Sequence, residues 1–190
     1  MKFYFFSVLY FFCLSGWVVG AEDATPASVK AAGVIAYAVK NKQTHLLLAN
    51  HQGLAFYRGY GAFGGGIEHG ESIAEAALRE FHEETRCAYK DQNIQLSEQS
   101  RVQVKNYVSY IIELPYIDEA TLLQLQEASS CNSAVFRERG PLRWYALRHN
   151  IKDRPLDDVA TLLESAPWHI WPASKKVIKK ALERGLIIVK

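Results

Sequence analysis

Residues 65–87 have the sequence GGIEHGESIAEAALREFHEETRC, and this stretch decides most of what the chain indicates about its fold. Three of its carboxylates, Glu80, Glu83 and Glu84, share one side of a predicted helix at about 100° per residue. Like charges at this spacing destabilise an isolated helix by roughly 0.2–0.5 kcal/mol per pair. Binding a hard divalent cation, Mg²⁺ or Mn²⁺, is the natural use of such a cluster.

The start of this helix is defined by a capping box. Ser72 and Glu75 have the required spacing, so the helix is predicted to begin near Ile73. Ala76 falls on the same side as the three glutamates. The side predicted to be buried consists of Ala74, Ala77, Leu78, Phe81 and Thr85.

The segment before the helix is rich in glycine. Residues 59–66 read GYGAFGGG, which lets the backbone approach a ligand closely. Backbone N–H groups of such a loop, together with a helix N-terminus, favour bound phosphate. The predicted site therefore combines phosphate, a divalent cation and carboxylates.

These residues together resemble the Nudix box, whose pattern is G-x5-E-x7-R-E-U-x-E-E-x-G-U, with U a bulky apolar residue. The positions in register are Gly65, Glu71, Arg79, Glu80, Phe81, Glu83 and Glu84. Arg86 stands where the family has glycine, and Cys87 takes the last apolar position. That glycine resembles a helix C′ residue with positive φ, where arginine costs about 1 kcal/mol.

The resemblance implies a role for each matching residue. The expected metal ligands are Glu80, Glu83, Glu84 and the carbonyl of Gly65, and the expected catalytic residues are Glu83, Glu80 and Arg79. Arg79 would pair with a box carboxylate and fix its rotamer. The loop would be supported by Glu71, Gly64, Gly66 and Gly70. A single Arg–Glu pair on a helix is usually a weak surface contact, so the prediction depends on the whole set in register.

The resemblance also implies the fold and the reaction. The expected fold is the Nudix fold, an α/β/α sandwich with a mixed β-sheet. Periodicity predicts strands at 32–39 and 44–49, joined as a hairpin, and at 54–60, 93–96, 102–114 and 142–147. It also predicts helices at 118–128, 156–164 and 174–184, the last ended by Gly185.

The implied activity is metal-dependent hydrolysis of a diphosphate linkage in a nucleoside diphosphate joined to another group. A further acid could come from Glu113, Glu127 or Glu138, and the substrate-binding residues are not predicted. One alternative is a non-catalytic exported module that binds a nucleotide or a protein. Another is a diphosphate isomerase on the same fold, which would need a thiol such as that of Cys87.

The first 21 residues have the features of a secretory signal peptide. Lys2 precedes an apolar run, and Val19-Gly20-Ala21 supplies the small residues of a cleavage site. Cleavage after Ala21 would leave residues 22–190 as a single exported domain, periplasmic or extracellular. An uncleaved membrane anchor is the alternative, because the run approaches a spanning length.

Charge and cysteine content restrict the partners. The formal net charge of +2 gives no strong field, so neither nucleic acid nor, after cleavage, a membrane is expected as a partner. The expected partner is a small nucleotide-type substrate, and the oligomeric state is not indicated. Cys87 and Cys131 could form a disulfide in an exported protein or remain free thiols.

Overall fold

The computed structural model describes residues 28–51, 59–128, 131, 139–147 and 169–189. The predicted leader, the predicted helix at 156–164 and most of the predicted strand at 54–60 lie outside these ranges. The strands are β1 (Ala31–Lys40), β2 (Gln43–Asn50), β3 (Tyr60–Gly61), β4 (Phe63–Gly66), β5 (Arg101–Val104), β6 (Tyr107–Glu113) and β7 (Leu142–Ala146). The helices are α1 (Ile73–Glu84), α2 (Glu119–Ala128) and α4 (Pro172–Glu183), with a 3₁₀ turn at Glu98–Ser100.

The sheet is mixed and is organised around β1. β6 runs parallel to β1 on one side, and β2 and β4 run antiparallel to it on the other. β2 pairs with the second half of β1 and β4 with the first half, so the segment β3–β4 fills the space where β1 and β2 diverge. β7 extends the sheet beyond β2, and β5 extends it beyond β6.

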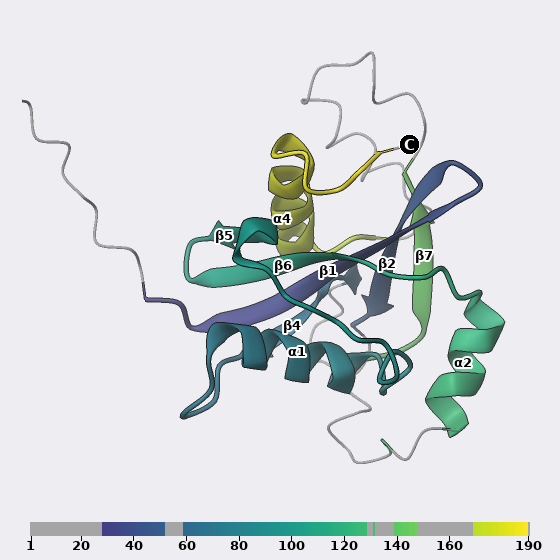
Figure 1. Cartoon of the computed structure of the whole chain (residues 1–190), viewed down its shortest axis with the longest axis horizontal. Helices are drawn as coiled ribbons and strands as arrows, with labels where there is room; N and C mark the ends of the chain where they lie inside the picture. Colours follow the sequence, from purple (N-terminus) through teal and green to yellow (C-terminus); the bar gives the residue numbers. More distant parts are fainter. Residues whose placement is uncertain (1–27, 52–58, 129–130, 132–138, 148–168, 190) are drawn as a thin grey trace, which may run out of the picture.

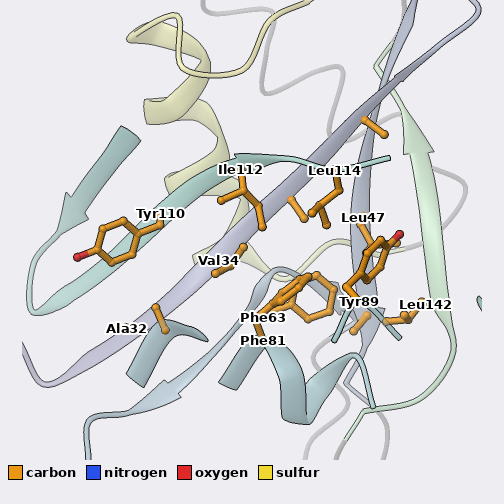
Figure 2. Close-up of a cluster of buried hydrophobic side chains, with 14 of the residues drawn as sticks. Ala32, Val34, Leu47, Phe63, Phe81, Tyr89, Tyr110, Ile112, Leu114 and Leu142 are labelled. Carbon is orange, nitrogen blue, oxygen red and sulfur yellow. The ribbon is translucent and has the colours of Figure 1, made fainter. Parts of the chain in front are cut away.

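Both faces of the sheet are covered, which gives the predicted α/β/α sandwich (Figure 1). Because β1 is buried on both faces, its side chains alternate between two cores. The core beneath α1 contains Ala32, Val34, Leu47, Phe63 and Phe81 (Figure 2). The opposite core lies under α4 and contains Ile35, Leu46, Leu48, Val177 and Ile178. Among the described residues, no helix has the length and apolar character needed to cross a membrane.

Local signals predicted most elements correctly. The hairpin of β1 and β2, the strand β7 and the helices α2 and α4 all lie where periodicity placed them. Gly185 follows α4 with φ 66°, the left-handed conformation that ends many helices. Ser72 and Glu75 form both hydrogen bonds of the capping box, and α1 begins at Ile73 as predicted.

Two strand predictions are wrong. Residues 93–96 form no strand. Ile94 and Leu96 alternate with polar residues because they pack against the core beneath α1, not because they pair with another strand. Residues 102–114 do not form one strand but contain the β5–β6 hairpin. Its two-residue turn starts at Lys105, with φ 55°, and such a turn usually carries a glycine or asparagine signal that Lys-Asn gives only in part.

The predicted buried face of α1 is also partly wrong. Ala77, Phe81 and Thr85 are buried as expected, but Ala74 and Leu78 are only half-buried. Ala76 and Glu84, placed on the open side by the helical wheel, are buried. Ala76 belongs to the core beneath α1, and Glu84 is covered from outside the helix by Gly64 and Arg139.

Candidate active site

The glycine segment passes so close to its neighbours that side chains are excluded. Gly64 pairs with Gly33 of β1, and a Cβ on Gly64 would lie 1.9 Å from the hydroxyl of Tyr107. Gly64 also has φ 147°, which disfavours other residues. The Tyr107 hydroxyl donates to the carbonyl of Phe63 at 3.1 Å. Burial, and then the nearby charges of Glu84 and Glu80, raise the pKa of Tyr107, which therefore stays protonated.

Gly65 lies directly against the carboxylate of Glu80. A Cβ on Gly65 would be 2.3–2.6 Å from the carboxyl atoms of Glu80, whereas a Cβ on Gly66 would meet nothing within 4 Å. The backbone of Gly65 and the Glu80 side chain, both predicted to bind the metal, are thus in contact across the loop.

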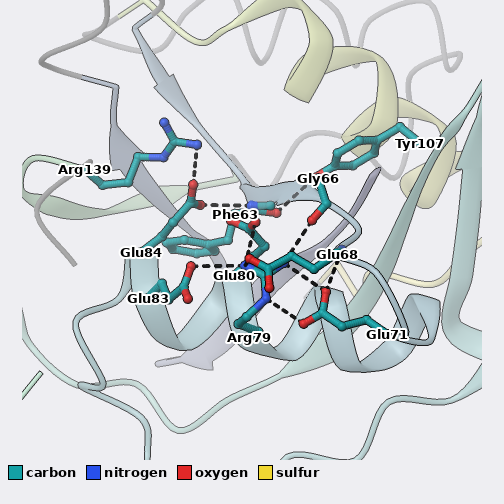
Figure 3. A network of polar contacts seen from close by, with 11 residues as sticks. Phe63, Gly66, Glu68, Glu71, Arg79, Glu80, Glu83, Glu84, Tyr107 and Arg139 are labelled. Atoms are coloured by element: carbon teal, nitrogen blue, oxygen red, sulfur yellow. Dashed lines mark hydrogen bonds and ion pairs between the residues drawn. The ribbon is translucent and has the colours of Figure 1, made fainter. Parts of the chain in front are cut away.

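Arg79 connects the loop to the carboxylates (Figure 3). Its Nε and Nη2 donate to the two carboxylate oxygens of Glu71 at 2.7 and 3.0 Å. Its Nη1 donates to Glu80 at 2.9 Å and to Glu83 at 3.2 Å, and its Nη2 also donates to the carbonyl of Gly66 at 2.9 Å. The predicted contact between Arg79 and a box carboxylate is therefore present. The hydrogen bond with Glu71 raises the pKa of Arg79 and lowers that of Glu71.

Glu71 and Gly70 shape the turn between β4 and α1. Glu71 accepts the backbone N–H of Glu68 at 2.9 Å while it binds Arg79. Gly70 has φ 89°, a conformation that side chains rarely adopt. The contacts of Glu71 connect the loop to α1, and the supporting role of Glu71 and Gly70 stays a prediction.

Glu84 is placed differently from the other two box glutamates. It is 3% exposed, and its Oε2 accepts the N–H of Gly64 at 2.9 Å. Its Oε1 forms an ion pair with Arg139, which is 7% exposed. Burial raises the pKa of Glu84 to about 8, while Arg139 and the Gly64 amide act in the opposite direction. The Gly64 N–H thus occupies one oxygen, and the other has its ion pair with Arg139 but no hydrogen-bond partner among the described residues.

The remaining donors fit a hard divalent cation. Glu80 and Glu83 are partly exposed, with side chains 13% and 20% accessible, and share Nη1 of Arg79. Mg²⁺ is usually held by one or two carboxylates, with waters and substrate phosphates completing its shell. Glu80 and Glu83 would supply two such carboxylates beside the backbone of Gly65. No three His, Cys, Asp or Glu side chains within the described ranges form a ready-made metal cluster.

The two positions that depart from the box pattern adopt the conformation that glycine would favour. Arg86 has φ 50° and Cys87 has φ 56°. Arg86 Nη2 donates to the carbonyl of Arg139 at 3.1 Å, and Cys87 forms a disulfide with Cys131. The expected cost of a left-handed arginine is thus accompanied by a tertiary contact. The disulfide also removes the free thiol that an isomerase would need.

Of the three additional acids expected from the sequence, Glu113 and Glu127 lie within the described residues, and no described contact places either of them at this site. Glu113 accepts a hydrogen bond from the hydroxyl of Tyr37, its partner on the neighbouring strand β1. Tyr37 lies four residues along β1 from Gly33. Glu127 is exposed on α2. Glu138 lies outside the described residues.

A cavity of about 300 Å³ lies on the other side of the glycine segment, between the β5–β6 hairpin and α4. The residues that line it include Ala62, Tyr107, Ser109, Trp171, Ser174 and Val177. Tyr107 connects this cavity to the site, because its hydroxyl contacts Phe63 and Gly64. Lys105 and Lys176 also contribute to the lining.

Arg139 is the site residue that sequence reasoning missed. It has no motif of its own, and its partner Glu84 lies far away in the chain. The only indirect signal was Cys131, whose possible bond to Cys87 would bring this segment to the end of the box helix.

The comparisons with known proteins agree with this architecture. The NUDIX domain profile matches residues 29–153. A MutT/nudix family protein from Enterococcus faecalis has 18% identity and a TM-score of 0.52, over 84% of this chain and 62% of that chain. The NUDIX domain of Shewanella oneidensis NrtR, complexed with ADP ribose, has 17% identity and a TM-score of 0.50, over 87% of this chain and 94% of that chain.

These structural likenesses concern the fold, and no protein of curated function matches the chain. The profile match covers well over half of the sequence and includes the whole box. The chain therefore belongs to the Nudix family.

Proposed function

We propose that this protein hydrolyses a diphosphate linkage in a nucleoside diphosphate derivative and that it requires Mg²⁺ or Mn²⁺. The observation that carries the proposal is the arrangement around Arg79, which holds Glu80 and Glu83 beside the backbone of Gly65. A chain that only needed a stable helix would gain little from placing these carboxylates together at a glycine loop.

The roles of the residues follow from this placement. When bound to Glu80, Glu83 and the Gly65 carbonyl, the metal would neutralise the diphosphate and lower the pKa of the attacking water. Glu80 or Glu83 accepts the proton of that water. The water oxygen bonds to phosphorus, the bridging P–O bond breaks, and the second phosphate leaves with the bond's electron pair. Arg79 keeps both carboxylates in position.

The cavity beside Tyr107 is the proposed place for the group beyond the phosphates. It adjoins the glycine segment, and Trp171 and Tyr107 offer aromatic surface for a base. Most other aromatic residues near the loop, such as Phe63 and Tyr110, are buried in the cores and are unavailable for stacking.

We also propose that the chain is exported, with a signal peptide cleaved after Ala21. The disulfide between Cys87 and Cys131 supports this, because such bonds persist in oxidising compartments. The absence of a nucleic-acid partner stays a prediction. Fractionation of cells and sequencing of the mature N-terminus would test the export proposal, and a cytoplasmic, unprocessed chain would contradict it.

The hydrolase is tested by phosphate-coupled assays with each metal on ADP-ribose, NADH, diadenosine polyphosphates, nucleotide sugars and nucleoside triphosphates. We expect metal-dependent turnover of at least one substrate, lost by about 10²-fold or more in Glu80→Gln and in Glu83→Gln. Glu127→Gln, an exposed glutamate on α2, is the matched control and should retain full activity. A folded protein silent across the panel would contradict the proposal.

A non-catalytic binding module is the second candidate. The observation in its favour is that Glu84, a ligand expected from the box, is already paired with Arg139. This candidate predicts that a nucleotide raises the melting temperature without being consumed, and that Mg²⁺ alone does not raise it.

A further inference from the structure

Three contacts fix Cys131, Arg139 and Gly140, two of them to the end of the box helix and one to β2. Cys131 is bonded to Cys87, and the Arg139 carbonyl accepts a hydrogen bond from Arg86. Gly140 N–H donates to the carbonyl of Asn50 at 2.7 Å, which fixes the same segment to the end of β2. The backbone of Arg139 is thus held between α1 and the sheet.

This placement brings the Arg139 guanidinium onto Glu84, away from Glu80 and Glu83 (Figure 3). Arg79 contacts those two carboxylates and Arg139 contacts the third, so the three box glutamates are divided between two arginines. Within the described part of the chain, neither Arg139 Nε nor Glu84 Oε1 has a hydrogen-bond partner, so charge attraction is what joins these two side chains.

A cation at Glu84 would have to displace a buried arginine. Removing one member of a buried ion pair leaves the other charged and desolvated, which is strongly unfavourable. Gly64 N–H occupies the second oxygen and would also lose its acceptor. A metal that already has Glu80, Glu83, the Gly65 carbonyl and substrate phosphates does not need this carboxylate.

We infer that Arg139 takes the place of a metal ion at Glu84, so that Glu84 supports the glycine loop and does not bind the metal. Arg86 and the Cys87–Cys131 disulfide are the positioning groups that keep Arg139 there. The two departures from the box pattern, at residues 86 and 87, thus have the same structural role, which is to hold Arg139 against Glu84. This inference rests on the proposed metal-dependent function and specifies which residues carry it.

The test is Mn²⁺ binding to the oxidised full-length protein, measured as free Mn²⁺ by electron paramagnetic resonance. Glu83→Gln should weaken binding by about tenfold or more. Because Glu84→Gln alone strands a buried arginine, the deciding variant is the double substitution Glu84→Gln with Arg139→Met, which removes both charges. We expect it to keep the wild-type number of Mn²⁺ ions and an affinity within about threefold of wild type.

A second variant removes only the arginine. Arg139→Met leaves the buried Glu84 without its cation and should lower the melting temperature, whereas Arg139→Lys, which keeps the charge, should lower it less. A folded double variant that loses Mn²⁺ as severely as Glu83→Gln would overturn this inference alone, as would a melting temperature of Arg139→Met equal to that of the wild type. Absence of Mn²⁺ binding in the wild-type protein would overturn the inference together with the proposed function.

Discussion

Gly65 and Gly66 are neighbours in the sequence but have different surroundings. A methyl group on Gly65 would collide with the Glu80 carboxylate, while one on Gly66 would meet open space. Neither residue has a φ in the left-handed region, so alanine introduces no backbone strain at either position. The pair therefore separates the effect on the site from the effect on the fold.

We expect Gly65→Ala to weaken Mn²⁺ binding and activity by about tenfold or more, because the new methyl group displaces the Glu80 side chain. Its stability should change by less than about 1 kcal/mol, since the displaced group is the end of a flexible side chain. Gly66→Ala should preserve Mn²⁺ binding, activity and stability. Isothermal titration measures Mn²⁺ binding, and urea unfolding measures stability. Equal metal binding in the two variants would contradict the placement of Glu80.

At the scale of the element, the capping box determines where α1 starts and hence where its carboxylates lie. Ser72 accepts the N–H of Glu75 at 3.2 Å, and Glu75 accepts that of Ser72 at 2.8 Å. Ser72→Ala should lower the free energy of unfolding by about 1 kcal/mol in urea titrations, because one N–H of the first turn loses its acceptor. Ser72→Asp retains an acceptor and is the control. It should lower the free energy of unfolding by only about 0.3 kcal/mol.

The disulfide links the other end of α1 to a segment 44 residues away. In the chain-entropy account, closing a loop of that length stabilises the fold by about 4 kcal/mol. Cys131→Ser should lower the free energy of unfolding in guanidinium by up to that amount, and adding dithiothreitol should lower it in the wild type alone. Equal stability of the oxidised and reduced wild-type chains would contradict the bond.

At the scale of the whole molecule, α4 completes the second core, although the family match ends at residue 153. Ile178 is fully buried against the sheet, while Ile188 is 48% exposed. Ile178→Ala should cost about 2–5 kcal/mol through lost burial and the cavity that remains. Ile188→Ala should cost less than about 0.5 kcal/mol. Thermal unfolding compares them, and similar melting temperatures would show that α4 does not stabilise the sheet.

Local signals in the sequence determined the box, the start of α1, the hairpin of β1 and β2, and the grouping of Glu80 with Glu83. Each depends on a local spacing of residues, or on a run of β-branched and aliphatic residues bounded by a polar turn, so local patterns and capping chemistry suffice to predict it. The same local logic predicted a strand at 93–96, where alternation arose from packing without strand pairing.

Only the tertiary structure determined the burial and the partners of Glu84. A helical wheel places it with Glu80 and Glu83, but the glycine loop and Arg139 cover it from outside the helix. The disulfide and the bond from Arg86 to the Arg139 carbonyl bring that residue into position. Contacts between residues this far apart depend on how the whole chain packs, which no local pattern encodes.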